Sequence, residues 1–93
     1  MKKNNVAETS LMAYIDLLES GNLNRNQIEV LKVFRKNPDR SFTNMEVADM
    51  LGWSINRVTP RTKELRDAGY LLTVGQRACL ITGNTAYAME LIL

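Results

Sequence analysis

The chain has 93 residues, of which 45% are hydrophobic, so it can bury the core of one small domain and we expect a single domain over residues 1–93. Its formal net charge of +2 does not by itself indicate nucleic-acid binding, although positive charge is concentrated in segments 21–40 and 54–77. Histidine is absent and Cys79 is the only cysteine, which excludes a Cys/His zinc site, an imidazole base and an intrachain disulfide.

Nothing in the sequence indicates a membrane protein or an enzyme. No apolar run approaches the ~20 residues that cross a bilayer, and residues 1–5 lead into no signal-peptide core, so we expect a cytoplasmic protein. The carboxylates have no nucleophile or base that converges on them, and no glycine-rich phosphate loop is present. We therefore expect no catalysis, no metal or other cofactor and no small-molecule ligand.

The first expected element is a helix over residues 9–20. Its apolar residues follow the spacing of one helix face: Leu11, Tyr14, Ile15 and Leu18. Thr9 is placed to cap this helix and Gly21 to end it. Met12 and Leu17 widen the apolar stripe, so we expect the helix to lie between other helices or against a second chain.

A second helix is expected to begin at Asn24. Asn24 and Gln27 have the spacing of a capping box, in which each side chain bonds the backbone amide of the other residue. Pro38 ends the helix, because the residue before a proline disfavours helical geometry. The apolar residues that recur on one side are Ile28, Leu31 and Phe34.

A third, shorter helix follows after a few residues. Thr43 and Glu46 form a second capping box at its start, and Gly52 ends it. Its inward residues are expected to be Val47, Ala48 and Leu51.

A fourth helix is expected over residues 55–68, with Ser54 as its cap and Gly69 closing it in left-handed geometry. Pro60 allows two interpretations. With Ser54 as the cap it lies in the second turn and bends the helix, whereas with Thr59 as the cap it takes the favoured first position. The inward residues are expected to be Ile55, Val58, Leu65 and Ala68.

The last two helices, joined by a short glycine-containing turn, form a helix-turn-helix over residues 43–68. Residues 70–92 are expected to form a β-wing. We predict strands over 70–74 and 78–82 joined by a turn at Gly75-Gln76, then a turn at Gly83-Asn84. Residues 85–93 suit a helix by composition, but the preceding turn favours a third strand.

The expected fold class is α+β, mainly α: a winged helix-turn-helix with a three-helix core, an extra N-terminal helix and a C-terminal β-hairpin wing. The core is expected to consist of Ile28, Leu31, Phe34, Val47, Leu51, Val58 and Leu65.

Segment 42–85 reads FTNMEVADMLGWSINRVTPRTKELRDAGYLLTVGQRACLITGNT. It resembles small winged-helix proteins of phages and prophages, in which a TN-x-E-[IV]-A stretch, a Leu-Gly turn, an N-R-V-T-P-R run, an E-L-R-x-x-G stretch and a late R-x-C…T-G recur. More broadly, it is similar to MarR-type and other winged-helix bacterial regulators. The resemblance implies binding of double-stranded DNA and regulation of transcription, in the host cytoplasm if a phage encodes the protein.

In a helix-turn-helix, the N-terminal half of the second helix reads base edges in the major groove. With Val58 and Leu65 buried, a step of about 100° per residue puts one row of residues on the opposite side. That row is Asn56, Pro60, Lys63 and Asp67, flanked on one edge by Thr59 and Arg66 and on the other by Arg57 and Glu64.

The residue types in and beside this row suit DNA. Asn56 can pair with adenine, and either Arg57 or Arg61 with guanine. Lys63 and Arg66 are better placed to bond phosphates, which position a protein without reading sequence.

The alternative is that these charges pair within the helix. Arg57 and Arg61 have helical spacings to Glu64 and Asp67, so they can form weakly stabilising ion pairs instead of meeting DNA. Trp53, just before the helix, is interpreted as a core or staple residue and not as a platform for base stacking.

Further DNA contacts are expected outside the fourth helix. Arg77, beside the expected Gly75-Gln76 turn, is the expected wing contact to the DNA backbone or minor groove. Ser41 and Thr43 are expected to bond phosphates through their hydroxyls and the free backbone amides at the start of the third helix. The complete set of predicted DNA-binding residues is Ser41, Thr43, Ser54, Asn56, Arg57, Thr59, Arg61, Lys63, Arg66 and Arg77.

A second class of function stays open at this point. Winged helices also serve as adaptors, and the apolar stretches 9–18 and 86–93 offer a surface for a host or phage protein. RNA binding is disfavoured because aromatic stacking residues on an exposed sheet are missing. A homodimer is predicted from surplus apolar residues that one small core would leave uncovered: Met12, Leu17, Met89, Leu91 and Ile92.

Overall fold

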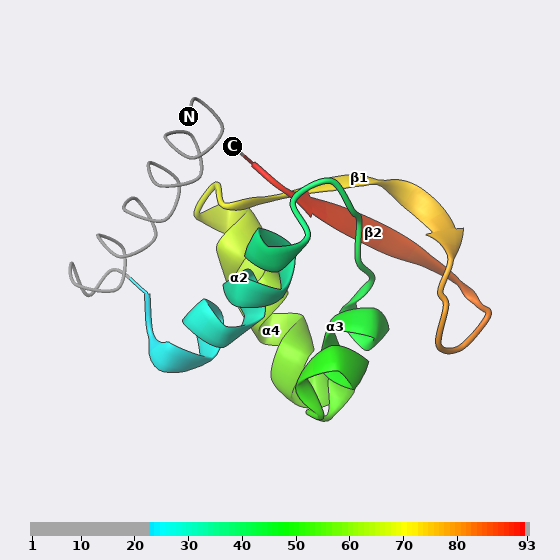
Figure 1. Cartoon of the computed structure of the whole chain (residues 1–93), viewed down its shortest axis with the longest axis horizontal. Coiled ribbons are helices and arrows are strands. Elements are labelled where there is room, and N and C mark those ends of the chain that lie inside the picture. Colours follow the sequence, from blue (N-terminus) through cyan, green and yellow to red (C-terminus); the bar gives the residue numbers. More distant parts are fainter. Residues whose placement is uncertain (1–22, 93) are drawn as a thin grey trace, which may run out of the picture.

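The computed structural model describes residues 23–92, in which three helices are followed by two strands. The elements are α2 (Arg25–Lys36), α3 (Asn44–Leu51), α4 (Ile55–Asp67), β1 (Leu71–Ala78) and β2 (Thr85–Leu91). The helices lie together on one side of the β1–β2 hairpin, whose far end extends beyond them (Figure 1). This arrangement confirms the predicted winged helix-turn-helix. The helix predicted over residues 9–20 lies outside the described residues.

Both predicted capping boxes are present. The Asn24 side chain accepts a hydrogen bond from the Gln27 amide at 2.8 Å, and Gln27 Oε1 accepts one from the Asn24 amide at 2.9 Å. Thr43 and Glu46 make the same reciprocal pair at the start of α3. Gly52 ends α3 with a φ of 69°, in the left-handed region that glycine adopts without strain.

The N-cap of α4 is Ser54, although its side chain makes no capping hydrogen bond. Pro60 therefore lies inside the helix, as in the first of the two interpretations. Because proline has no N–H, the helix lacks one backbone hydrogen bond at this turn. Ala68 was expected to face inward, but it is the C-cap and is exposed, because it lies just beyond the last turn that packs on the core.

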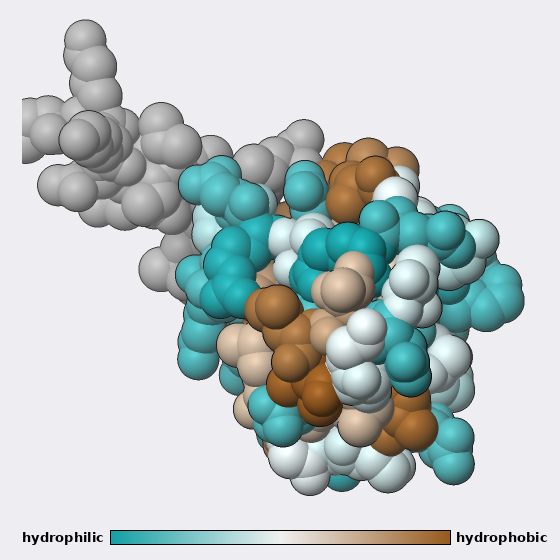
Figure 2. Space-filling model, turned by 90° about the vertical axis from the view of Figure 1, so that its right-hand side faces the viewer, coloured by the Kyte–Doolittle hydropathy of each residue, from teal (hydrophilic) through white to brown (hydrophobic). Residues whose placement is uncertain are grey.

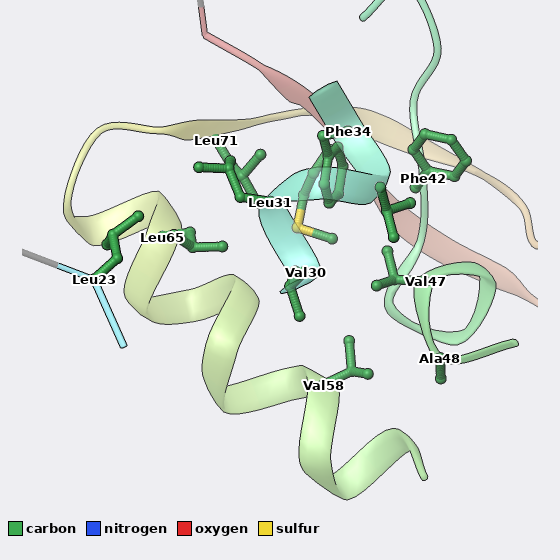
Figure 3. Packing of buried hydrophobic residues seen from close by; sticks show 12 residues of the cluster. Leu23, Val30, Leu31, Phe34, Phe42, Val47, Ala48, Val58, Leu65 and Leu71 are labelled. Carbon is green, nitrogen blue, oxygen red and sulfur yellow. The ribbon is translucent and has the colours of Figure 1, made fainter. Parts of the chain in front are cut away.

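The core lies where the three helices meet the hairpin (Figure 3). Val58 and Leu65 of α4 have no exposed surface, as predicted, and Ile28 and Leu51 pack against the cluster while partly exposed. The other large, fully buried hydrophobic residues of this cluster are Val30, Leu31, Phe34, Phe42, Val47, Leu71 and Met89. Burial of one side of α4 in this cluster leaves its opposite side on the surface.

The hairpin turns at a different place from the one predicted. β1 continues through Gly75 and Gln76, and the chain reverses over residues 79–84, where the Cys79 amide donates to the Asn84 carbonyl at 2.8 Å. The predicted Gly75-Gln76 turn and the predicted strand over 78–82 are therefore wrong. The strand preferred for residues 85–93 is confirmed as β2, although it is the second strand and not a third.

Gly75 has a φ of 141° because it lies at an irregularity of the sheet, where the register shifts between Thr73 and Gly75. The inner end of the hairpin is attached to the helices by Phe42 and Met89, which exchange two backbone hydrogen bonds of 2.9 Å. This bridge fixes β2 beside the segment that leads into α3.

Candidate nucleic-acid interface

The outer surface of α4 carries the row of residues that the helical spacing predicts. Asn56, Pro60, Lys63 and Asp67 are all exposed. Lys63 Nζ lies 3.0 Å from Asp67 Oδ2, with side chains that are 66% and 68% exposed. An ion pair this exposed contributes little to stability, so Lys63 can exchange its carboxylate for another anion at little cost.

On the edge of the row that faces α2, Arg57 is held by two neighbours. Its Cζ lies 3.6 Å from the centroid of the Trp53 ring, and its Nη2 donates to Asn26 Oδ1 at 3.1 Å. Trp53 is half-buried against the core, which confirms its interpretation as a packing residue. Arg57 remains exposed.

Further along the same edge, Arg61 forms the intrahelical pair that was the alternative to DNA contact. Its Nε and Nη2 each donate to Glu64 at 2.8 Å, and Gln27 of α2 donates to the same carboxylate at 2.8 Å. The hydrogen bonds from Arg61, and then that from Gln27, lower the pKa of Glu64, so this carboxylate is ionised at neutral pH. The charge of Arg61 is therefore offset within the protein.

The opposite edge of the row faces the hairpin. The Thr59 hydroxyl donates to the Ile55 carbonyl at 3.0 Å and stays exposed. Arg66 is half-buried, and its Nη1 lies 3.1 Å from the sulfur of Met89. Arg66 thus lies at the junction of α4 and β2 with no carboxylate partner among residues 23–92 in the ion pairs of the structure.

Three predicted contacts outside α4 are brought together by the structure, but they turn inward. Thr43 is buried, and its hydroxyl accepts from the Glu46 amide and contacts the Cys79 sulfur at 3.2 Å. Ser41 presents both its hydroxyl and its carbonyl to Arg77. Arg77 was expected beside a turn at Gly75-Gln76, but that turn is absent, and Arg77 lies within β1, shortly before the chain reverses over residues 79–84.

Every N–H of the Arg77 guanidinium has an acceptor inside the protein. Nε donates to Ser41 Oγ, Nη1 to Glu46 and the Ala78 carbonyl, and Nη2 to Glu46 and the Ser41 carbonyl, at 2.7–3.1 Å. A guanidinium has five N–H groups, so none is left for a phosphate. Arg77 therefore fixes the wing and does not offer a free cationic contact.

Glu46, which the sequence indicated only as a capping residue, lies at the centre of this cluster. Its carboxylate accepts from Arg77, the Thr43 amide and the Leu80 amide, and its side chain is 5% exposed. The hydrogen bonds from Arg77 lower the pKa of Glu46 from 4.5 to about 2, against the desolvation that raises it. No local sequence pattern indicates this role, because Arg77 and Leu80 lie more than 30 positions from Glu46 along the chain.

The free end of the wing carries no charge. Between Arg77 and Glu90 the sequence contains no Lys, Arg, Asp or Glu, and Leu80, Ile81 and Tyr87 are exposed there. Figure 2 shows apolar side chains gathered in patches among polar ones on this side of the molecule. A shallow depression of about 300 Å³ lies beside the wing base, lined by Arg40, Ser41, Arg77, Ala78 and Leu80.

The described residues hold neither a membrane span nor a metal site. Among residues 23–92, no helix has the length and hydropathy needed to cross a bilayer. In the same range, no three His, Cys, Asp or Glu side chains gather in a way that would hold a metal ion.

Comparison with known proteins identifies the fold but not a family. No protein-family model matches the chain, and no curated protein sequence does either. The solved structure of a possible transcriptional regulator from Methanosarcina mazei Go1 is similar, with a TM-score of 0.67 and 22% sequence identity. The match covers 89% of this chain and 66% of that one, slightly less than two thirds of its length.

Proposed function

We propose that the chain binds double-stranded DNA and regulates transcription, with α4 as the recognition helix in the major groove. The observation that carries this proposal is the exposed polar row of α4, in which Asn56 and Lys63 project from a helix whose other side is locked in the core. A helix-turn-helix presents this face of its second helix to base edges.

In this proposal, different residues of the row make different kinds of DNA contact. Asn56 and Arg57 lie near the start of α4 and suit base edges, whereas Lys63 and Arg66 lie further along and suit phosphates. Ser54, whose side chain makes no capping bond, and Thr59 add exposed hydroxyls at the same end. Arg61, Ser41, Thr43 and Arg77 act indirectly in this proposal, by holding α4 and the wing in place.

The similarity of the whole fold to a possible transcriptional regulator supports a regulatory role. The resemblance of segment 42–85 to phage and prophage proteins supports a regulator encoded by a phage. Both lines of support concern the class of function and leave the target sequence open.

The test is a titration of the protein into labelled random-sequence duplex DNA over a series of salt concentrations. The proposal predicts binding whose log affinity falls linearly with log salt, by roughly 0.9 for each phosphate contact. Single-stranded DNA and double-stranded RNA of the same sequences serve as controls and should bind more weakly. Absence of duplex binding at low salt would overturn the proposal.

A second candidate is an adaptor that binds a host or phage protein. The specific observation in its favour is the uncharged wing end, where Leu80 is 73% exposed and Tyr87 63% exposed. The same titration separates the two, since an adaptor without DNA affinity gives no signal with any duplex.

The homodimer predicted from the sequence also stays a proposal, but fewer exposed apolar residues support it than the sequence suggested. Met89 is buried in the core and Leu91 packs against it, which leaves Ile92 exposed at 44%. Met12 and Leu17 lie outside the described residues. Sedimentation at micromolar concentration decides between monomer and dimer.

A further inference from the structure

Arg57 is the only arginine of α4 that combines an exposed side chain with two supports outside the helix. The first support is the Trp53 ring, whose centroid lies 3.6 Å from Arg57 Cζ. The second is the Asn26 side chain of α2, whose Oδ1 accepts from Nη2 at 3.1 Å. A cation directly over an aromatic face is attracted by the ring quadrupole, and Trp provides the strongest such face.

Both supports are themselves fixed. The Trp53 amide donates to the Ala48 carbonyl at 3.0 Å, and its ring packs against the core. Asn26 lies in the first turn of α2, between the two capping-box residues Asn24 and Gln27. The ring restrains the out-of-plane motion of the guanidinium and the hydrogen bond restrains its rotation, so the two together fix its direction.

This restraint leaves most of the donors of Arg57 free. One N–H is used by Asn26, and no carboxylate among residues 23–92 pairs with Arg57 in the ion pairs of the structure. Arg61 is the opposite case, because two of its nitrogens are bound to Glu64. Arg57 and Arg61 are the two arginines whose position suits a guanine. Of these two, Arg57 is the one whose charge and remaining N–H donors are available to a base.

We infer that Trp53 and Asn26 hold Arg57 in an orientation that lets it donate to O6 and N7 of guanine, so that the chain prefers a G·C pair at one position of its DNA site. The inference rests on the proposed function and makes Trp53 and Asn26 positioning residues for recognition. A guanidinium that is ordered before binding loses less conformational freedom when it contacts the base. This raises the selectivity of the arginine–guanine contact.

The test is selection from a randomised duplex library, followed by titration of duplexes that differ only at the preferred G·C pair. Arg57→Ala should reduce the preference for that pair by roughly 5- to 150-fold, the range of a good bidentate contact. Asn26→Ala should reduce it by about two- to tenfold, as expected for loss of one hydrogen bond. Asn26→Ala should have no further effect when Arg57 is already alanine.

Two conservative variants separate positioning from folding. Trp53→Phe keeps an aromatic face and should keep most of the preference. Asn26→Asp keeps an acceptor but places a carboxylate against Arg57, as Glu64 lies against Arg61, so it should weaken the preference without unfolding the chain. Asn26→Ala should reduce the preference and leave the slope of log affinity against log salt nearly unchanged, because no phosphate contact is lost.

Each outcome has one meaning. If Arg57→Ala loses the G·C preference and Asn26→Ala retains it in full, the positioning role is wrong and DNA reading by Arg57 stands. If the wild type binds duplex and Arg57→Ala keeps the same preference, the inference fails while the proposed function survives. If the wild type binds no duplex at low salt, both fail together.

Discussion

Arg77 and Glu46 join the wing to the helix-turn-helix through two hydrogen bonds of 2.7 Å between their side chains. Arg77 belongs to β1 and Glu46 to α3, and the two residues are 31 positions apart in the chain. The Glu46 side chain is 5% exposed and that of Arg77 32%, so the carboxylate is shielded from water while part of the guanidinium is not. The orientation of the wing therefore depends on an ion pair in which every N–H of the Arg77 guanidinium is already bonded.

The first prediction concerns the removal of this pair. Arg77→Met leaves a buried carboxylate without its partner, which typically costs 3–5 kcal/mol, and partial exposure of Arg77 reduces the expected loss to about 2–3 kcal/mol. Lys63→Met is the matched control, because it also removes the cation of an ion pair, but one on the surface, and should cost less than about 0.5 kcal/mol. Urea unfolding at neutral pH measures both. Equal losses for the two variants would contradict a structural role for Arg77.

The second prediction concerns the dependence of stability on pH. The pKa of Glu46 is about 2 in the folded chain and 4.5 ordinarily, so folding favours its ionised form. The resulting stabilisation is complete above pH 4.5 and is lost as the pH falls toward 2, by about 3 kcal/mol in total. The lowered pKa of Glu64 acts in the same direction.

Glu46→Gln is the variant that isolates this contribution. It should be less stable than the wild type at pH 7, and the difference should shrink as the pH approaches 2. Urea unfolding of both proteins over that pH range measures the difference directly. A difference that stays constant with pH would assign the loss to packing and not to the charge of Glu46.

The helix-turn-helix could be predicted from the sequence because its signals are local. Thr43 and Glu46 are three residues apart, Gly52 follows at the end of the same helix, and the burial of Val58 and Leu65 follows from helical periodicity. Each of these features depends on residues within one or two helical turns of each other, so the spacing of residues in the sequence is sufficient to predict them.

The wing could not be predicted in the same way. A glycine with positive φ serves both at a tight turn and at a sheet irregularity, and Gly75 is the second case while Gly83, with a φ of 77°, lies in the true turn. The choice between them depends on the bridge between Phe42 and Met89 and on the Glu46 cluster, which are contacts between distant parts of the chain. The position of Arg77 within β1 could not be predicted for the same reason.

The third prediction distinguishes a core residue from an interface residue. Met89 was expected among the surplus apolar residues of a dimer, but it is 1% exposed, so Met89→Ala should lower the free energy of unfolding by about 2–4 kcal/mol. Ile92, which is 44% exposed, serves as the control, and Ile92→Ala should cost less than about 1 kcal/mol. Unfolding at several protein concentrations checks both. A concentration-dependent loss for Met89→Ala would indicate that the side chain stabilises a dimer instead.

The last prediction separates the two kinds of contact proposed for α4. Lys63→Ala should weaken binding to all duplexes alike and flatten the slope of log affinity against log salt by about one unit, because one phosphate contact is lost. Asn56→Ala should relax sequence preference and leave the slope nearly unchanged, since a base contact displaces few counterions.

Both variants should remain folded, because both side chains are exposed and the Lys63–Asp67 pair is a surface pair. Lys36→Ala is the control for charge alone, since Lys36 is exposed at the end of α2 that lies farthest along the helix from Asn26. It removes the same charge as Lys63→Ala but should leave the slope unchanged. Equal effects of the two lysine variants would mean that net charge, and not the face of α4, governs the binding of duplex DNA.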